Sequence, residues 1–169
     1  MARRQINSEE LETLFMRIGE GVWHLQNVED ALNNYIALKL DVKEPGLFTQ
    51  AEVEQFLTKH RGNTLGKSLK NSKEAGVLSE GLQHRLEEFK EERNWLVHRS
   101  VYLHREDLYI DEKRDNLMRR IQAFSTEAKI LQKEIDRELS DFAVSKGVNQ
   151  KWIDQESEKT IRRLRGELV

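Results

Sequence analysis

The chain has 169 residues, of which 34% are charged and 37% are hydrophobic. This balance predicts a single folded domain with a polar surface and argues against a disordered chain. The net charge of -2 argues against a generally basic nucleic-acid-binding surface but permits a local basic pocket, and the absence of cysteine excludes disulfides and cysteine metal sites. The first residues lack the apolar core of a signal peptide, and no stretch of about 18 apolar residues occurs, so we expect a cytoplasmic protein with no membrane partner.

The first predicted helix begins at Asn7, whose spacing from Glu10 is that of a capping box. Apolar residues recur at intervals of three and four from there to about Leu40, which predicts one long amphipathic helix. Pro45 and Gly46 then mark a loop.

A shorter helix is expected up to about Arg61, with Ala51, Phe56 and Leu57 directed inward. Between Lys59 and Lys73 the chain carries five Lys or Arg residues and no acid. Such a run is most often a solvated face, but it can also provide a path for RNA. The three lysines that we consider for RNA binding are Lys67, Lys70 and Lys73.

A further helix is predicted from about Ser79 past His98, followed by a break at residues 106–109 and a second long helix over residues 111–147. Asn149 can cap a final helix. The predicted fold is therefore an all-α bundle of about five to six helices, two of them long. Residues 1–147 are expected to form the bundle, and residues 148–169 to form a C-terminal helix packed on the same domain.

The helix from Ser79 onward differs from a plain core helix. Its inward row consists of Leu82, Leu86, Phe89, Leu96 and Val97. Arg93 falls in the middle of that row, where a guanidinium is costly unless it is paired or faces a polar cavity.

The other side of this helix carries Trp95, His98 and Tyr102, although an exposed face rarely collects two large aromatic residues. We therefore expect a second buried face, packed against a partner. Asn94 and His98 are four residues apart and should be neighbours, whereas Arg93 points away from both on an ideal helix.

The sequence Arg-Asn-Trp-Leu-Val-His at residues 93–98 resembles the Arg-(four to six residues)-His motif of the HEPN family. In that family a polar residue commonly follows the arginine, as Asn94 does here, and the motif lies on a later helix of a helical bundle. Some HEPN toxins carry a tyrosine two residues after the histidine, which the partner protein modifies; Ser100 stands at that position here.

The resemblance implies a metal-independent endoribonuclease that works as a homodimer, without cofactor or metal, in a toxin–antitoxin or phage-defence system with a possible antitoxin partner. His98 would act as base or acid on RNA, Arg93 would hold phosphate oxygens, and Asn94 would orient His98 or the phosphate by hydrogen bonds. Trp95 and Tyr102 would make dimer contacts, and Tyr102 would also contact RNA bases.

Other interpretations stay open at this stage. Arg93 could form a buried ion pair with Glu12 or Glu20, and Trp95 and Tyr102 could simply pack in the core. The whole domain could be a non-catalytic, HEPN-like interaction or nucleotide-binding module. A plain antiparallel coiled coil is disfavoured, because Arg93 and several glycines interrupt the apolar pattern.

Overall fold

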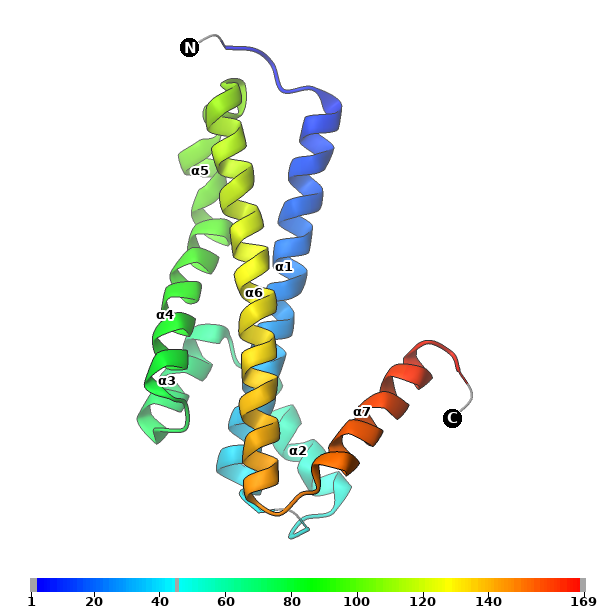
Figure 1. Ribbon diagram of the computed structural model, residues 1–169. Coiled ribbons are helices and arrows are strands. Elements are labelled where there is room, and N and C mark those ends of the chain that lie inside the picture. Colours follow the sequence, from blue (N-terminus) through cyan, green and yellow to red (C-terminus); the bar gives the residue numbers. More distant parts are fainter. Residues whose placement is uncertain (1–2, 45, 168–169) are drawn as a thin grey trace.

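Two long helices form the axis of the molecule. α1 (Ser8–Ala37) has 30 residues and α6 (Asp111–Ser145) has 35. They lie side by side along much of their length in the computed structural model, which describes residues 3–44 and 46–167 (Figure 1). All the regular elements within these ranges are helical, so the predicted all-α fold with two long helices is confirmed.

Local signals set the start of α1. The Asn7 side chain accepts the backbone N–H of Glu10, and the Glu10 carboxylate accepts the backbone N–H of Asn7 at 3.0 Å. This is the predicted capping box, and it satisfies two of the N–H groups that a helix start leaves free. At its other end α1 widens into a π-helical turn, η1 (Leu38–Val42), and stops where Lys43 takes a positive φ of 58°.

Two shorter helices follow. α2 (Gln50–Arg61) and α3 (Leu65–Ala75) are each preceded by a capping threonine, Thr49 and Thr64. The prediction that Ala51 faces inward is wrong, because it is exposed in the first turn of α2; Phe56 and Leu57 are half-buried.

The next three elements make one continuous rod along α6 (Figure 1). α4 (Glu80–Asn94) passes into a second π-helical turn, η2 (Trp95–Arg99), and then into α5 (Ser100–His104). A short 3-10 turn, η3 (Asp107–Tyr109), leads into α6. The rod and α1 enclose the core with α6.

The core is continuous from one end of the bundle to the other, and Phe89 and Phe124 stack in it with 4.6 Å between ring centroids. Gly21 lets α1 pack closely against α6 and the rod. A Cβ atom at this position would lie 3.3 Å from the Phe124 ring and 3.4 Å from Leu96, so a larger residue would require these side chains to shift.

The last helix, α7 (Gln150–Leu164), starts at the predicted cap, Asn149. It extends away from the bundle instead of lying against it, and none of its 15 residues is buried (Figure 1). The expectation that residues 148–169 pack on the same domain is therefore not met by α7. None of the helices in the described part of the chain is both long and apolar enough to cross a membrane.

Candidate functional site

The motif lies where the rod changes from α-helix to π-helix. Arg93 and Asn94 are the last two residues of α4, and His98 lies inside η2. The Ser100 N–H donates to the carbonyl of Trp95, five residues earlier. The wider turn reduces the angle between side chains five positions apart, so Arg93 and His98 diverge less than they would on an ideal α-helix.

A side chain supports this wider turn. In a regular α-helix the Leu96 carbonyl would accept the Ser100 N–H. Here it accepts the Ser100 hydroxyl at 2.7 Å, and this frees the amide to bond one residue further back. Ser100 therefore satisfies the carbonyl that the π-helical turn would otherwise leave without its donor.

Arg93 is largely buried but poorly satisfied. Its side chain is 24% exposed, and one Nη donates to Asn94 Oδ1 at 3.1 Å. The other Nη lies 4.0 Å from Glu29 Oε1, and Nε is buried with no hydrogen-bond acceptor. The two Nη groups carry four N–H donors, of which one is bonded to Asn94, so they retain donors for an incoming acceptor.

Neither of the two acids that the sequence suggested as ion-pair partners of Arg93 pairs with it. Glu20 accepts from Lys129 at 2.6 Å, and Glu12 is exposed. The acid near Arg93 is Glu29, which also accepts the Leu65 N–H at 3.2 Å at the start of α3. The same Glu29 oxygen therefore accepts the N–H at the start of α3 and lies 4.0 Å from the Arg93 guanidinium.

His98 is exposed, and within the described residues it takes part in no hydrogen bond or ion pair. Both ring nitrogens can therefore reach a substrate. This accessibility is what proton transfer to or from a bound molecule requires.

Trp95 was expected to contact a second subunit, and this prediction is wrong. The residue is only 4% exposed and packs within its own chain. The Arg120 guanidinium of α6 lies 3.7 Å from the ring centroid, and the indole N–H donates to His104 Nε2 at 3.2 Å. The residue is therefore a packing residue, and it is not available for a dimer contact or for stacking on a base.

Tyr102, by contrast, is 78% exposed, as its predicted roles require. Val97, Val101 and Leu103 are also exposed on η2 and α5, and Val101 in addition lines the pocket that faces α1. Exposed apolar side chains gathered on one short stretch of helix are typical of a binding interface.

The three lysines lie on α3, and acids already engage two of them. Lys70 pairs with Glu74 at 3.8 Å and Lys73 with Glu87 at 3.2 Å, whereas Lys67 is exposed and has no ion pair within the described part of the chain.

The sequence did not point to Arg105, a further cation that is exposed and has no ion pair within the described ranges. Its position shortly after His98 and Tyr102 in the sequence is a signal that could have found it.

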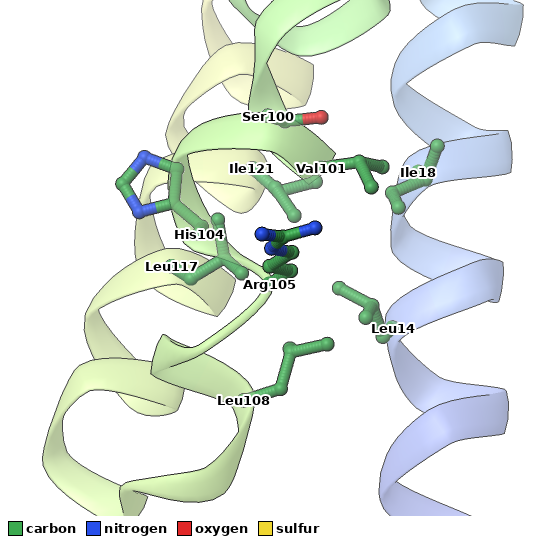
Figure 2. Close-up of a pocket in the computed structure, with 9 residues that line it drawn as sticks. All are labelled: Leu14, Ile18, Ser100, Val101, His104, Arg105, Leu108, Leu117 and Ile121. Atoms are coloured by element: carbon green, nitrogen blue, oxygen red, sulfur yellow. The ribbon is translucent and has the colours of Figure 1, made fainter.

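Arg105 also lines an apolar pocket between α1, α5 and α6 (Figure 2). Leu14 and Ile18 of α1 form one wall, and Leu117 and Ile121 of α6 form another. Besides Arg105 the polar lining residues are Ser100 and His104, whose polar atoms are already hydrogen-bonded within the chain, so the pocket suits packing and not proton transfer.

The described residues contain no group of three or more His, Asp or Glu side chains that could hold a metal ion. Comparisons of the chain with protein-family models, with curated proteins and with solved structures found no match. The likeness of residues 93–98 to the HEPN motif therefore remains a prediction from the sequence.

Proposed function

We propose that the protein is a metal-independent endoribonuclease of the HEPN kind, with Arg93, Asn94 and His98 as its catalytic residues. The observation that carries the proposal is that one distorted stretch of helix holds both Arg93, largely buried and with few hydrogen-bond partners, and the accessible His98. Strained or widened helical turns are frequent at functional sites.

The chemistry follows from these side chains. The RNA 2′-oxygen attacks the adjacent phosphorus, the new 2′-O–P bond forms, and the proton of the 2′-hydroxyl passes to neutral His98. Arg93 donates to the non-bridging oxygens as the phosphorane gains negative charge, and Asn94 holds the guanidinium through its Oδ1 atom. The P–O5′ bond then breaks, and the 5′-oxygen takes a proton from an imidazolium, that of the second copy in a dimer.

The same surface supports the two proposed partners, RNA and a second copy of the chain. Tyr102 and Arg105 are exposed within two turns after His98, so one offers a face for a base and the other a charge for a phosphate. The exposed apolar side chains of Val97 and Leu103 support docking of a second copy near these residues. Lys67 remains a candidate RNA contact; Lys70 and Lys73 would first have to leave their acids.

We further propose that the protein is the toxin of a toxin–antitoxin or phage-defence pair, with an antitoxin partner that restrains it. This part rests on the family resemblance of residues 93–98 alone. Growth arrest on expression of the wild type, but not of His98→Ala, would support it; normal growth at equal protein levels would contradict it.

The test of the enzymatic proposal is cleavage of total tRNA and mRNA in EDTA by the wild type and by His98→Ala. His84→Ala is the matched control, since His84 is also exposed on this rod and contacts only Glu88, at 3.6 Å, within the described residues. We expect cleavage by the wild type and the control, 2′,3′-cyclic phosphate ends, and a loss of about 10²-fold or more in His98→Ala.

Equal cleavage by wild type and His98→Ala would contradict the proposal. So would an Arg93→Ala protein that is less stable while the wild type leaves RNA intact. That second outcome would identify the domain as a non-catalytic interaction or nucleotide-binding module, in which Arg93 serves the fold.

A further inference from the structure

Three side chains form a hydrogen-bonded chain beside the motif. Asp107 Oδ2 lies 2.8 Å from His104 Nδ1, and His104 Nε2 lies 3.2 Å from Trp95 Nε1. An indole nitrogen can only donate, so His104 Nε2 must accept and the imidazole proton must be on Nδ1, where it donates to Asp107. The arrangement therefore requires His104 in its neutral form, in one tautomer.

The other side of Trp95 is held as well. The Arg120 guanidinium lies over the ring at 3.7 Å from its centroid, and Glu92 fixes that guanidinium with two hydrogen bonds of 2.9 and 2.8 Å. Trp95 is thus clamped between α5 and α6. Its own carbonyl accepts the Ser100 N–H that defines η2, and Asn94 and His98 lie on either side of it in the chain.

We infer that His104 is a positioning residue for the proposed ribonuclease site: the neutral imidazole, oriented by Asp107, fixes Trp95 and with it the π-helical turn that carries His98. The inference rests on the proposed function and adds two residues that the motif does not contain. Neither His104 nor Asp107 touches the substrate in this scheme.

The bond to Trp95 needs the neutral imidazole. An N–H on both ring nitrogens would oppose the indole N–H at 3.2 Å, and the bond to Trp95 would be lost. The charged groups around His104 are Asp107 of η3, the adjacent Arg105, and Lys113 and Arg120 of α6. From α1 the residues that reach the same region are the apolar Leu14 and Ile18.

These charges act in opposite directions on an imidazolium. The Asp107 carboxylate attracts it, and the hydrogen bond from His104, followed by that from Lys113, lowers the pKa of Asp107 below its usual range. Lys113 and Arg120 repel it. A charged His104 would therefore keep its bond to Asp107 and lose its bond to Trp95.

Two substitutions of His104 can each keep one of these two bonds and remove the other at neutral pH. In His104→Asn the amide nitrogen can replace Nδ1 and keep the bond to Asp107, but nothing reaches Trp95. In His104→Gln the amide oxygen can replace Nε2 and keep the bond from Trp95. His84→Asn, on the exposed side of α4, is the control for the loss of an imidazole.

The first measurement uses no RNA: hydrogen exchange of the Trp95 indole N–H and the Ser100 amide N–H by NMR, with the indole assigned from Trp95→Phe. We expect exchange to quicken about tenfold in His104→Asn, to stay near the wild-type rate in His104→Gln, and to be unchanged in His84→Asn. Unchanged exchange in His104→Asn would overturn the inference whatever the protein does to RNA.

The second measurement is RNA cleavage, with kcat and KM determined separately. Positioning predicts that His104→Asn lowers kcat about 10- to 100-fold while KM changes little, and that His104→Gln restores most of the loss. A fall in kcat no larger than that of His84→Asn, despite altered exchange, would also overturn it. Failure of the wild type to cleave any RNA would instead remove the proposed function, and the exchange results would still show whether His104 holds the turn.

Discussion

The two π-helical turns of this protein are similar in length and different in surroundings. η1 closes with the Lys43 N–H on the Leu38 carbonyl at 2.9 Å, and η2 closes with the Ser100 N–H on the Trp95 carbonyl. None of the five residues of η1 is buried, and its helix ends there. η2 buries Trp95 and Leu96 and continues into α5.

A widened turn inside a helix needs support that a widened turn at a helix end does not. A turn at a helix end can widen because nothing follows it that must stay in register. A turn within a helix loses its regular bonds and must be supported, here by the Ser100 hydroxyl and by the contacts of Trp95. Of the two turns only η2 contains a residue of the proposed site, His98, so changes in the two turns should differ in their effects on stability and on RNA cleavage.

The largest difference should come from truncating one apolar side chain in each turn. Trp95→Ala should lower the free energy of unfolding by about 3–5 kcal/mol, because it empties a buried site and releases Arg120. Leu40→Ala, at a half-buried position of η1, should cost about 1–2 kcal/mol. Urea denaturation measures both; equal costs would mean that the two turns are supported alike.

A polar contact holds η1 to α2, and its loss should leave the chemistry intact. His60 is buried, and its Nε2 lies 2.6 Å from Asp41 Oδ2. His60→Ala should cost about 1–3 kcal/mol because Asp41 loses this partner. RNA cleavage by the folded variant should equal that of the wild type, and a tenfold loss would show that the η1 end also takes part in the reaction.

The hydroxyl that supports η2 should affect cleavage more than stability. Ser100→Ala should cost only about 0.5–1.5 kcal/mol, because the Leu96 carbonyl can then accept the backbone N–H of the substituted residue in a regular α-turn. That change would rotate His98 relative to Arg93 and lower the cleavage rate about tenfold or more. Ser125→Ala is the control, since Ser125 is also buried and its hydroxyl bonds four residues back, to Ile121 at 3.4 Å, in regular α6; an equal loss of cleavage there would contradict the role of the turn.

Low pH and high pH should destabilise opposite ends of the bundle. At the η2 end, hydrogen bonds from Arg4 and then from the Asn7 backbone lower the pKa of Glu10 to about 2. A lowered pKa contributes stability above the unfolded value of about 4.5, and this contribution is lost as the pH falls toward 2.

At the η1 end, burial and then the bond to Glu138 raise the pKa of Tyr35, so its contribution is present below pH 10 and is lost as the pH rises above that value. Hydrogen exchange should therefore quicken first near the start of α1 in acid and first around Tyr35 in alkali. The same order at both extremes would contradict the prediction.

The fold was predictable wherever the signal was local. The cap at Asn7, the long apolar rows and the cap at Asn149 each depend on residues a few positions apart. The side of α4 that carries Arg85 and Glu92 was harder to interpret, because both residues pair across to α6 and make an internal face look exposed. Trp95 adjoins that face, which is why its burial was missed.

The candidate site was predictable as a motif and not as a geometry. The order of Arg93, Asn94 and His98 is visible in the sequence, but η2 depends on a hydroxyl after the motif and on contacts with residues further along the chain. An ideal helical projection continued through η2 misplaced Val97, which is exposed although it was expected in the inward row. Periodicity cannot show where a helix changes its pitch.

The unsatisfied donors of Arg93 have a consequence for the energy of the empty protein. The buried Nε–H of Arg93 has no acceptor and costs stability. An oxyanion bound by the Nη groups should raise the melting temperature by linkage, equivalent to about 2.7 kcal/mol when its concentration is about a hundredfold above Kd. Arg93→Met, which fills the same space without donors, should conversely melt at or above the wild-type temperature while losing the site, so selection for the arginine would be selection against maximal stability.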